Sequence, residues 1–144
     1  MNKQRTEIVK LLQYKQETCA RLLQKMAEQV ESVCNQDSSR LAVIIEGKER
    51  LIAGLVKTDQ NIAKLVGGLD EATRELLVRE NEELGRRIKS DLEKIIEQEN
   101  SCQEKLGIVK NEVVEKILSL KKGQTILKGY GASPRVKPKI SKNI

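Results

Sequence analysis

Residues 84–127 read LGRRIKSDLEKIIEQENSCQEKLGIVKNEVVEKILSLKKGQTIL, and this stretch decides the fold. Apolar side chains recur in it at steps of three and four residues, which in an α-helix places them along one narrow stripe. They are Leu84, Ile88, Leu92, Ile95, Cys102, Leu106, Val109, Val113, Ile117, Leu120 and Leu127. No proline interrupts residues 70–130, where a continuous helix would be on the order of 90 Å long. One helix cannot bury its own stripe, so the stripe predicts packing against other helices.

The spacing is mostly heptad-like, but it slips to four-and-four steps at two places, around Ile88 and around Val113. Such slips locally unwind a supercoil and favour a helical bundle over a perfect coiled coil. The composition agrees, because only 38% of the residues are hydrophobic and 1% are aromatic. A stripe of Leu, Ile and Val is suited to helix-on-helix packing.

Two shorter helices are expected before this stretch, over residues 6–34 and 38–66. Thr6 is a candidate cap for the first, and Ser38 or Ser39 for the second, after a turn-prone segment at 35–39. Gly67 and Gly68 then supply the left-handed conformation with which helices commonly end. Asp70 is expected to start the third helix, where acidic residues favour the positive end of the helix dipole.

Two arrangements of these helices satisfy the sequence. In the first, an antiparallel pair covers half of a continuous third helix, and the other half projects. In the second, the third helix breaks near Gly85, Gly107 or Gly123 and folds back. We prefer projection, because no proline or turn cluster marks a break. The expected fold is therefore all-α, an antiparallel three-helix bundle with a long, coiled-coil-like C-terminal helix over residues 70–130.

Positive charge is concentrated at the end of the chain. The eight lysines and arginines after Glu115 have no acidic residue among them, so of the net charge of +6 they supply +8 and the first 115 residues carry −2. Residues 131–144 are basic, contain proline and lack periodicity, which predicts a disordered tail after a helical domain at 1–130. The tail could bind nucleic acid or an anionic membrane, but we favour a solvated, flexible end, since no aromatic stacking platform accompanies it.

The sequence offers little chemistry for catalysis. Histidine is absent, which removes the commonest general base and metal ligand. Cys19, Cys34 and Cys102 are scattered, with no CxxC pair, and are expected to be small buried or half-buried residues rather than disulfides. We expect no enzymatic activity, no metal and no cofactor. Without a signal peptide or an apolar run of membrane-spanning length, we expect a soluble, cytoplasmic protein.

The half of the stripe beyond Cys102 has two interpretations. Leu and Ile at helical spacing usually form the core of the same chain. However, the first two helices are too short to cover all of the third. We therefore favour a surface over residues 102–130 that binds the amphipathic helix of another protein.

The chain resembles the FlgN family of flagellar type III export chaperones. The segment Ile45-Glu-Gly-Lys-Glu-Arg-Leu-Ile is similar to that of the family's second helix, in which a Lys-Glu pair, here Lys48 and Glu49, precedes aliphatic residues. The end of the last helix, Ile126-Leu-Lys-Gly-Tyr-Gly, resembles the family's leucine-and-tyrosine element. The basic tail departs from the acidic character common among export chaperones.

The resemblance implies a cytoplasmic chaperone for hook–filament junction proteins, which keeps them competent for export and delivers them to the export gate. It places the partner contact on the second half of the last helix and docking to the export gate on Tyr130. The contact residues would be Leu106, Val109, Val113, Ile117, Leu120 and Leu127. Two alternatives stay open: a self-assembling coiled-coil adaptor, in which a second copy covers the stripe, and a helical protein that binds nucleic acid or membrane through its tail.

Overall fold

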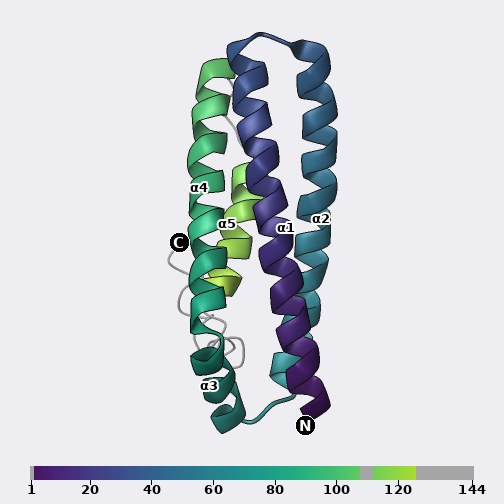
Figure 1. The fold of residues 1–144 in the computed structure, drawn as a ribbon, viewed down its shortest axis with the longest axis vertical. Helices are drawn as coiled ribbons and strands as arrows, with labels where there is room; N and C mark the ends of the chain where they lie inside the picture. Colours follow the sequence, from purple (N-terminus) through teal and green to yellow (C-terminus); the bar gives the residue numbers. More distant parts are fainter. Residues whose placement is uncertain (1, 108–111, 126–144) are drawn as a thin grey trace, which may run out of the picture.

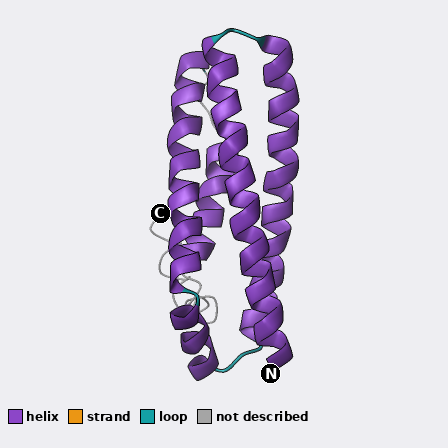
Figure 2. Ribbon diagram, viewed as in Figure 1, coloured by secondary structure: helices purple, strands orange, loops and turns teal. Residues whose placement is uncertain are grey.

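A computed structural model describes residues 2–107 and 112–125 of the chain, and every regular element within these ranges is an α-helix. In chain order the helices are α1 (Asn2–Cys34), α2 (Ser38–Gly67), α3 (Glu71–Glu80), α4 (Glu82–Leu106) and α5 (Glu112–Thr125). They pack against one another as a bundle, which confirms the all-α prediction (Figure 2).

The bundle is built around α1. Figure 1 shows α1 between α2 and α4, with α2 running opposite to both, and α5 lying behind α1. Helix α5 packs mainly on α4 and more narrowly on α2. Helix α1 thus covers one side of the α2 and α4 pair, and α5 covers the other side.

The apolar residues of the first helix face the core, as the spacing predicts. Ile8, Leu12, Cys19, Leu22 and Met26 are all buried. The core divides into two clusters: one near the N-terminus of α1 that includes Leu69 and Leu77, and a larger one in the middle of the bundle. The larger cluster is the one to which α5 contributes.

The capping residues of α2 differ from the expected ones. Asp37, rather than Ser38 or Ser39, is the N-cap, and its side chain accepts a hydrogen bond of 3.1 Å from the backbone N–H of Arg40. At the other end, Gly68 has φ −89° and is not left-handed, so the expected left-handed cap is wrong. Helix α3 begins as predicted, with Asp70 accepting a hydrogen bond of 2.7 Å from the N–H of Thr73.

The predicted single helix over residues 70–130 is wrong. It is interrupted at Asn81, whose side-chain amide donates a hydrogen bond of 2.9 Å to the carbonyl of Leu77, one turn earlier. It ends at Gly107, which has φ +75°, a conformation that glycine adopts without a Cβ clash. Folding back at this glycine buries the apolar side of α5 within the same molecule, so the alternative with a break near Gly107 is the observed one.

Several expectations fall on parts of the chain outside the described residues. They are the contact residues Val109 and Leu127, the docking residue Tyr130, and the disordered tail at 131–144. Within the described residues, no helix combines the length and the apolar character needed to cross a membrane.

Candidate functional site

The candidate site is the groove between α2 and α4 in which α5 lies. Helix α5 reaches into it with three buried apolar side chains, Val114, Ile117 and Leu120. The neighbouring Leu118 points the other way and is 43% exposed. This helix therefore has one apolar face toward the bundle and one face in solvent.

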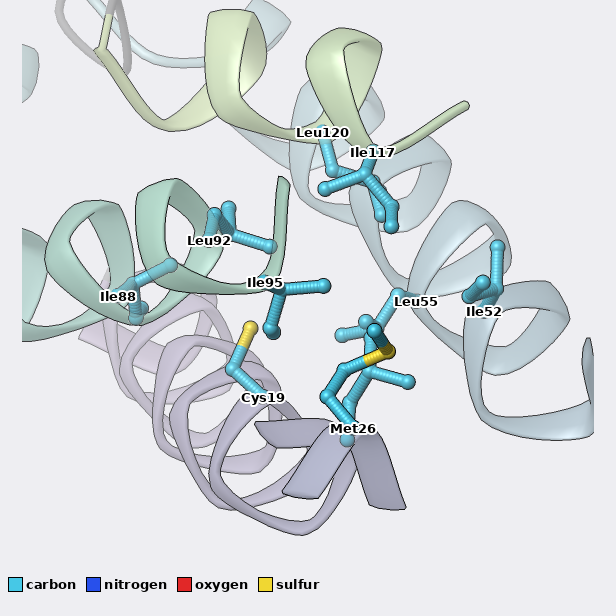
Figure 3. Close-up of a cluster of buried hydrophobic side chains, with 10 residues drawn as sticks. Cys19, Met26, Ile52, Leu55, Ile88, Leu92, Ile95, Ile117 and Leu120 are labelled. Atoms are coloured by element: carbon cyan, nitrogen blue, oxygen red, sulfur yellow. The ribbon is translucent and has the colours of Figure 1, made fainter. Parts of the chain in front are cut away.

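The lining of the groove comes from three helices. Figure 3 shows Ile117 and Leu120 directed from α5 toward the side chains of α2 and α4, with those of α1 beneath them. These lining residues are Ile52 and Leu55 of α2, Leu92 and Ile95 of α4, and Cys19 and Met26 of α1. All are aliphatic or sulfur-containing, so the groove presents an apolar surface to the buried face of α5.

One buried lysine ties α5 to the rest of the bundle. Lys15 of α1 is fully buried, and its Nζ lies 2.6 Å from a carboxylate oxygen of Asp59 on α2. The same Nζ donates a hydrogen bond of 3.4 Å to the backbone carbonyl of Leu120. Because the acceptor is a backbone carbonyl, this contact is available to any helix in the same position, whatever its sequence.

Burial shifts the titration of two groups near Lys15. Desolvation raises the pKa of Asp59, and this effect outweighs the opposing influence of the Lys15 charge and its hydrogen bond. Burial also raises the pKa of the Cys19 thiol to about 12. Cys19 is therefore a protonated core residue at neutral pH rather than a nucleophile.

A surface ion pair adds a weaker tie between α4 and α5. Nζ of Lys121 lies 3.1 Å from a carboxylate oxygen of Glu93, and both side chains are partly exposed. Exposed pairs of this kind contribute about 0–1 kcal/mol. The three buried side chains and the Lys15 contact therefore hold α5 more than this pair does.

A second polar cluster joins α1, α2 and α4 within the core. Nζ of Lys48 donates hydrogen bonds of 2.7 Å to Oε1 of Gln29 and 2.7 Å to Oε1 of Glu99, and all three side chains are buried. Gln29 also donates to Oε1 of Glu99 at 3.2 Å, and Gln103 donates to its Oε2 at 2.6 Å. Both oxygens of Glu99 are thus hydrogen-bonded, which makes this a structural cluster rather than an open site.

The sequence reasoning placed Lys48 on the inner side of its helix but missed Lys15, Gln29 and Glu99. A signal for them was present. Lys15 and Gln29 fall at three-and-four spacing among the core residues of α1, and Glu99 lies midway between Ile95 and Cys102. Polar residues at stripe positions are the ones to test for buried pairing.

The predicted contact residues are not brought together on one exposed surface. Leu106, at the end of α4, is 43% exposed, whereas Ile117 and Leu120 are in the core. The backbone of Val113 lies in α5, but its side chain is not described. In this conformation Ile117 and Leu120 contact a partner only if α5 leaves the groove.

Comparison with known proteins adds no relative. No family model, no curated protein and no solved structure matches the chain. Among the described residues, no group of three or more cysteine, aspartate or glutamate side chains is placed to hold a metal ion.

Proposed function

We propose that this protein is a non-enzymatic chaperone that binds an amphipathic helix of a partner protein in the groove between α2 and α4. The observation that carries the proposal is the placement of α5, a helix of 14 residues whose three buried apolar side chains fill that groove. A helix of this length is marginally stable by itself in water, so its order depends on the groove. Another helix with the same apolar spacing can compete for the same position.

The partner class that we propose is the hook–filament junction proteins, held before flagellar type III export. Support comes from the resemblance of residues 45–52 to the FlgN family. That segment lies on α2, where Lys48 and Ile52 are buried and Glu49 is exposed. The Lys-Glu pair thus has one member in the core cluster and one in solvent. The assignment of export-gate docking to Tyr130 belongs to the same proposal.

The groove is occupied in the described conformation, so partner binding requires α5 to be displaced. The apparent affinity is then reduced by the fraction of molecules in which the groove is open. A variant that weakens the seating of α5 should raise that fraction. Such a variant should therefore bind the partner more tightly, whereas a variant that damages the binding site should bind it more weakly.

The test is calorimetric titration of the full chain with a hook–filament junction protein. For the double variant Ile117→Asp/Leu120→Asp we expect the dissociation constant to fall by roughly tenfold or more, because the competing helix no longer fills the groove. The matched control is Leu118→Asp, on the exposed side of the same helix, which should bind like the unaltered chain.

Loss of binding in the double variant alone would place the partner contact on α5 itself, as the sequence predicts for Ile117 and Leu120. Absence of binding by the unaltered chain and by both variants would contradict the proposed partner class.

A further inference from the structure

The contacts between α4 and α5 are arranged symmetrically about Gly107. The two helices run in opposite directions side by side (Figure 1). Lys121 and Glu93, which form the ion pair between them, lie fourteen positions after and before this glycine. Residues of α5 therefore meet residues of α4 that are about equally far from the break.

The helical pattern itself does not stop at Gly107. The buried positions of α4 are Ile88, Leu92, Ile95, Glu99 and Cys102, with steps of four, three, four and three. The same steps continue through Leu106, Val109 and Val113. A helix continuing straight past Gly107 would keep one unbroken stripe.

We infer that α5 can exchange between two copies of this chain, giving a dimer in which each copy's α5 lies in the other's groove. In this form α4 and α5 are continuous, and two such helices run antiparallel about a twofold axis near Gly107. The symmetry of the pairing means that the same contacts form again between copies. Ile117 and Leu120 enter the partner copy's groove, Leu120 meets the partner copy's Lys15, and Lys121 meets the partner copy's Glu93. Exchange of an identical element in this way is a low-cost route to a dimer.

Gly107 decides which form is populated. Its φ of +75° favours the folded-back chain, and a Cβ added there would meet no atom within 4 Å. An alanine would thus be opposed by its backbone conformation alone. The same alanine would favour a straight helix over glycine. The inference needs no other protein, so it stands or falls separately from the chaperone proposal.

The experiment measures molar mass by light scattering over a range of concentrations for the full chain and for Gly107→Ala. Replacing glycine by alanine should shift the balance toward the straight helix by about thirtyfold at residue 107 of each copy. Since the dimer contains two such residues, we expect its dissociation constant to fall by roughly a thousandfold. The control is Gly67→Ala, at a glycine without positive φ and likewise with open space around it. It should behave like the unaltered chain.

Cross-linking then identifies the exchanged contact. Two Gly107→Ala chains, each also carrying Cys34→Ser to remove the exposed thiol, receive Lys121→Cys in one and Glu93→Cys in the other. Mixed and treated with a short bis-maleimide, they should give a covalent dimer containing one copy of each. A Gly107→Ala chain that stays monomeric with native helicity, or a dimer that gives no such cross-link, would overturn the inference.

If Gly107→Ala lost its helical structure, the cross-linking would be repeated with the two cysteine variants that keep Gly107. Cross-linked dimer that increases with chain concentration would support exchange. Only uncross-linked chains at the highest concentration would refute it.

Discussion

Among the described residues, Lys15 and Lys48 are the lysines buried in the bundle, and each is paired with an acidic side chain. Lys15 pairs with Asp59, and Lys48 pairs with Glu99. Taking an ion pair out of water costs several kcal/mol per ion, which close geometry and additional hydrogen bonds must offset. At Lys48 the additional partner is Gln29, and at Lys15 it is the carbonyl of Leu120. Each pair joins two different helices and therefore helps to fix their relative alignment.

The Lys48–Glu99 pair predicts unequal effects of single and double substitution. Lys48→Met leaves a buried carboxylate without its cation and should lower the free energy of unfolding by about 3–5 kcal/mol. Lys48→Met combined with Glu99→Leu removes both charges and should restore most of that loss. Urea unfolding followed by circular dichroism at 222 nm measures both. Equal losses in the single and double variants would contradict a coupled pair.

Asp59 predicts a dependence of stability on pH. Because burial raises the pKa of Asp59 in the folded protein above its ordinary value of 3.8, the folded state binds the proton more tightly than the unfolded state. The stabilisation from this group is complete below pH 3.8 and is lost as the pH rises through the shifted pKa. Relative to Asp59→Asn, the unaltered chain should therefore lose stability with rising pH in this window. A difference between the two chains that does not vary with pH would be evidence against the shift.

At the scale of elements, α5 has less extensive packing than the three long helices α1, α2 and α4. Helix α1 packs on both α2 and α4 along most of its length, whereas α5 covers one groove with three buried side chains. Local opening is drawn from the least packed parts of a structure. We therefore expect α5 to open before the rest of the bundle.

Hydrogen exchange of two variants, Ile117→Asp and Leu118→Asp, should show whether α5 opens separately from the rest of the bundle. Ile117→Asp places a charge in an aliphatic groove and forfeits about 1.5–3 kcal/mol of side-chain burial. The backbone amides of α5 should lose protection, while those of α1 and α2 keep theirs. Leu118→Asp, one position along on the exposed face, should leave the exchange pattern unaltered. Loss of protection throughout the bundle would mean that α5 is an integral part of one cooperative unit.

At the scale of the molecule, the fold is three long helices with a fourth supplied by the end of the same chain. Helix α1 covers one side of α2 and α4, and α5 covers the other (Figure 1). The chain thus provides its own cover for an apolar surface that partners or further copies could also cover. This shared surface connects the proposed chaperone function with the proposed exchange.

A shortened chain tests this architecture. Residues 1–107 should remain helical, since α1 keeps its contacts with both α2 and α4. The groove lined by Leu55 and Leu92 should become exposed, and the fluorescence of an apolar dye such as ANS should increase. A peptide of residues 112–125 added in trans should reverse that increase. No dye binding by the shortened chain would show that the groove closes without α5.

Helix type, the buried face of each helix and the helix ends around residues 34–38 and 67–71 follow from the sequence alone, whereas the start of α1 at Asn2 and the breaks after Glu80 and Leu106 do not. Apolar spacing of three and four residues identifies the inner face whatever packs against it, and Asp70 begins its helix through a contact three residues away. The break within the last helix was not decided locally. At Gly107 the glycine permits both a straight and a left-handed backbone, and residues before and after it carry the same stripe.

Only the tertiary structure chose between these two paths. The folded-back path places Ile117 and Leu120 in a groove of the same chain, built from residues far away in the sequence that include Ile52 and Leu55. In a single chain, the straight path would leave them in water. The spacing within α1 places Lys15 at a core position, but it does not identify the partners of a buried lysine. Those partners, Asp59 and the carbonyl of Leu120, come from two other helices and are brought to Lys15 by the tertiary structure.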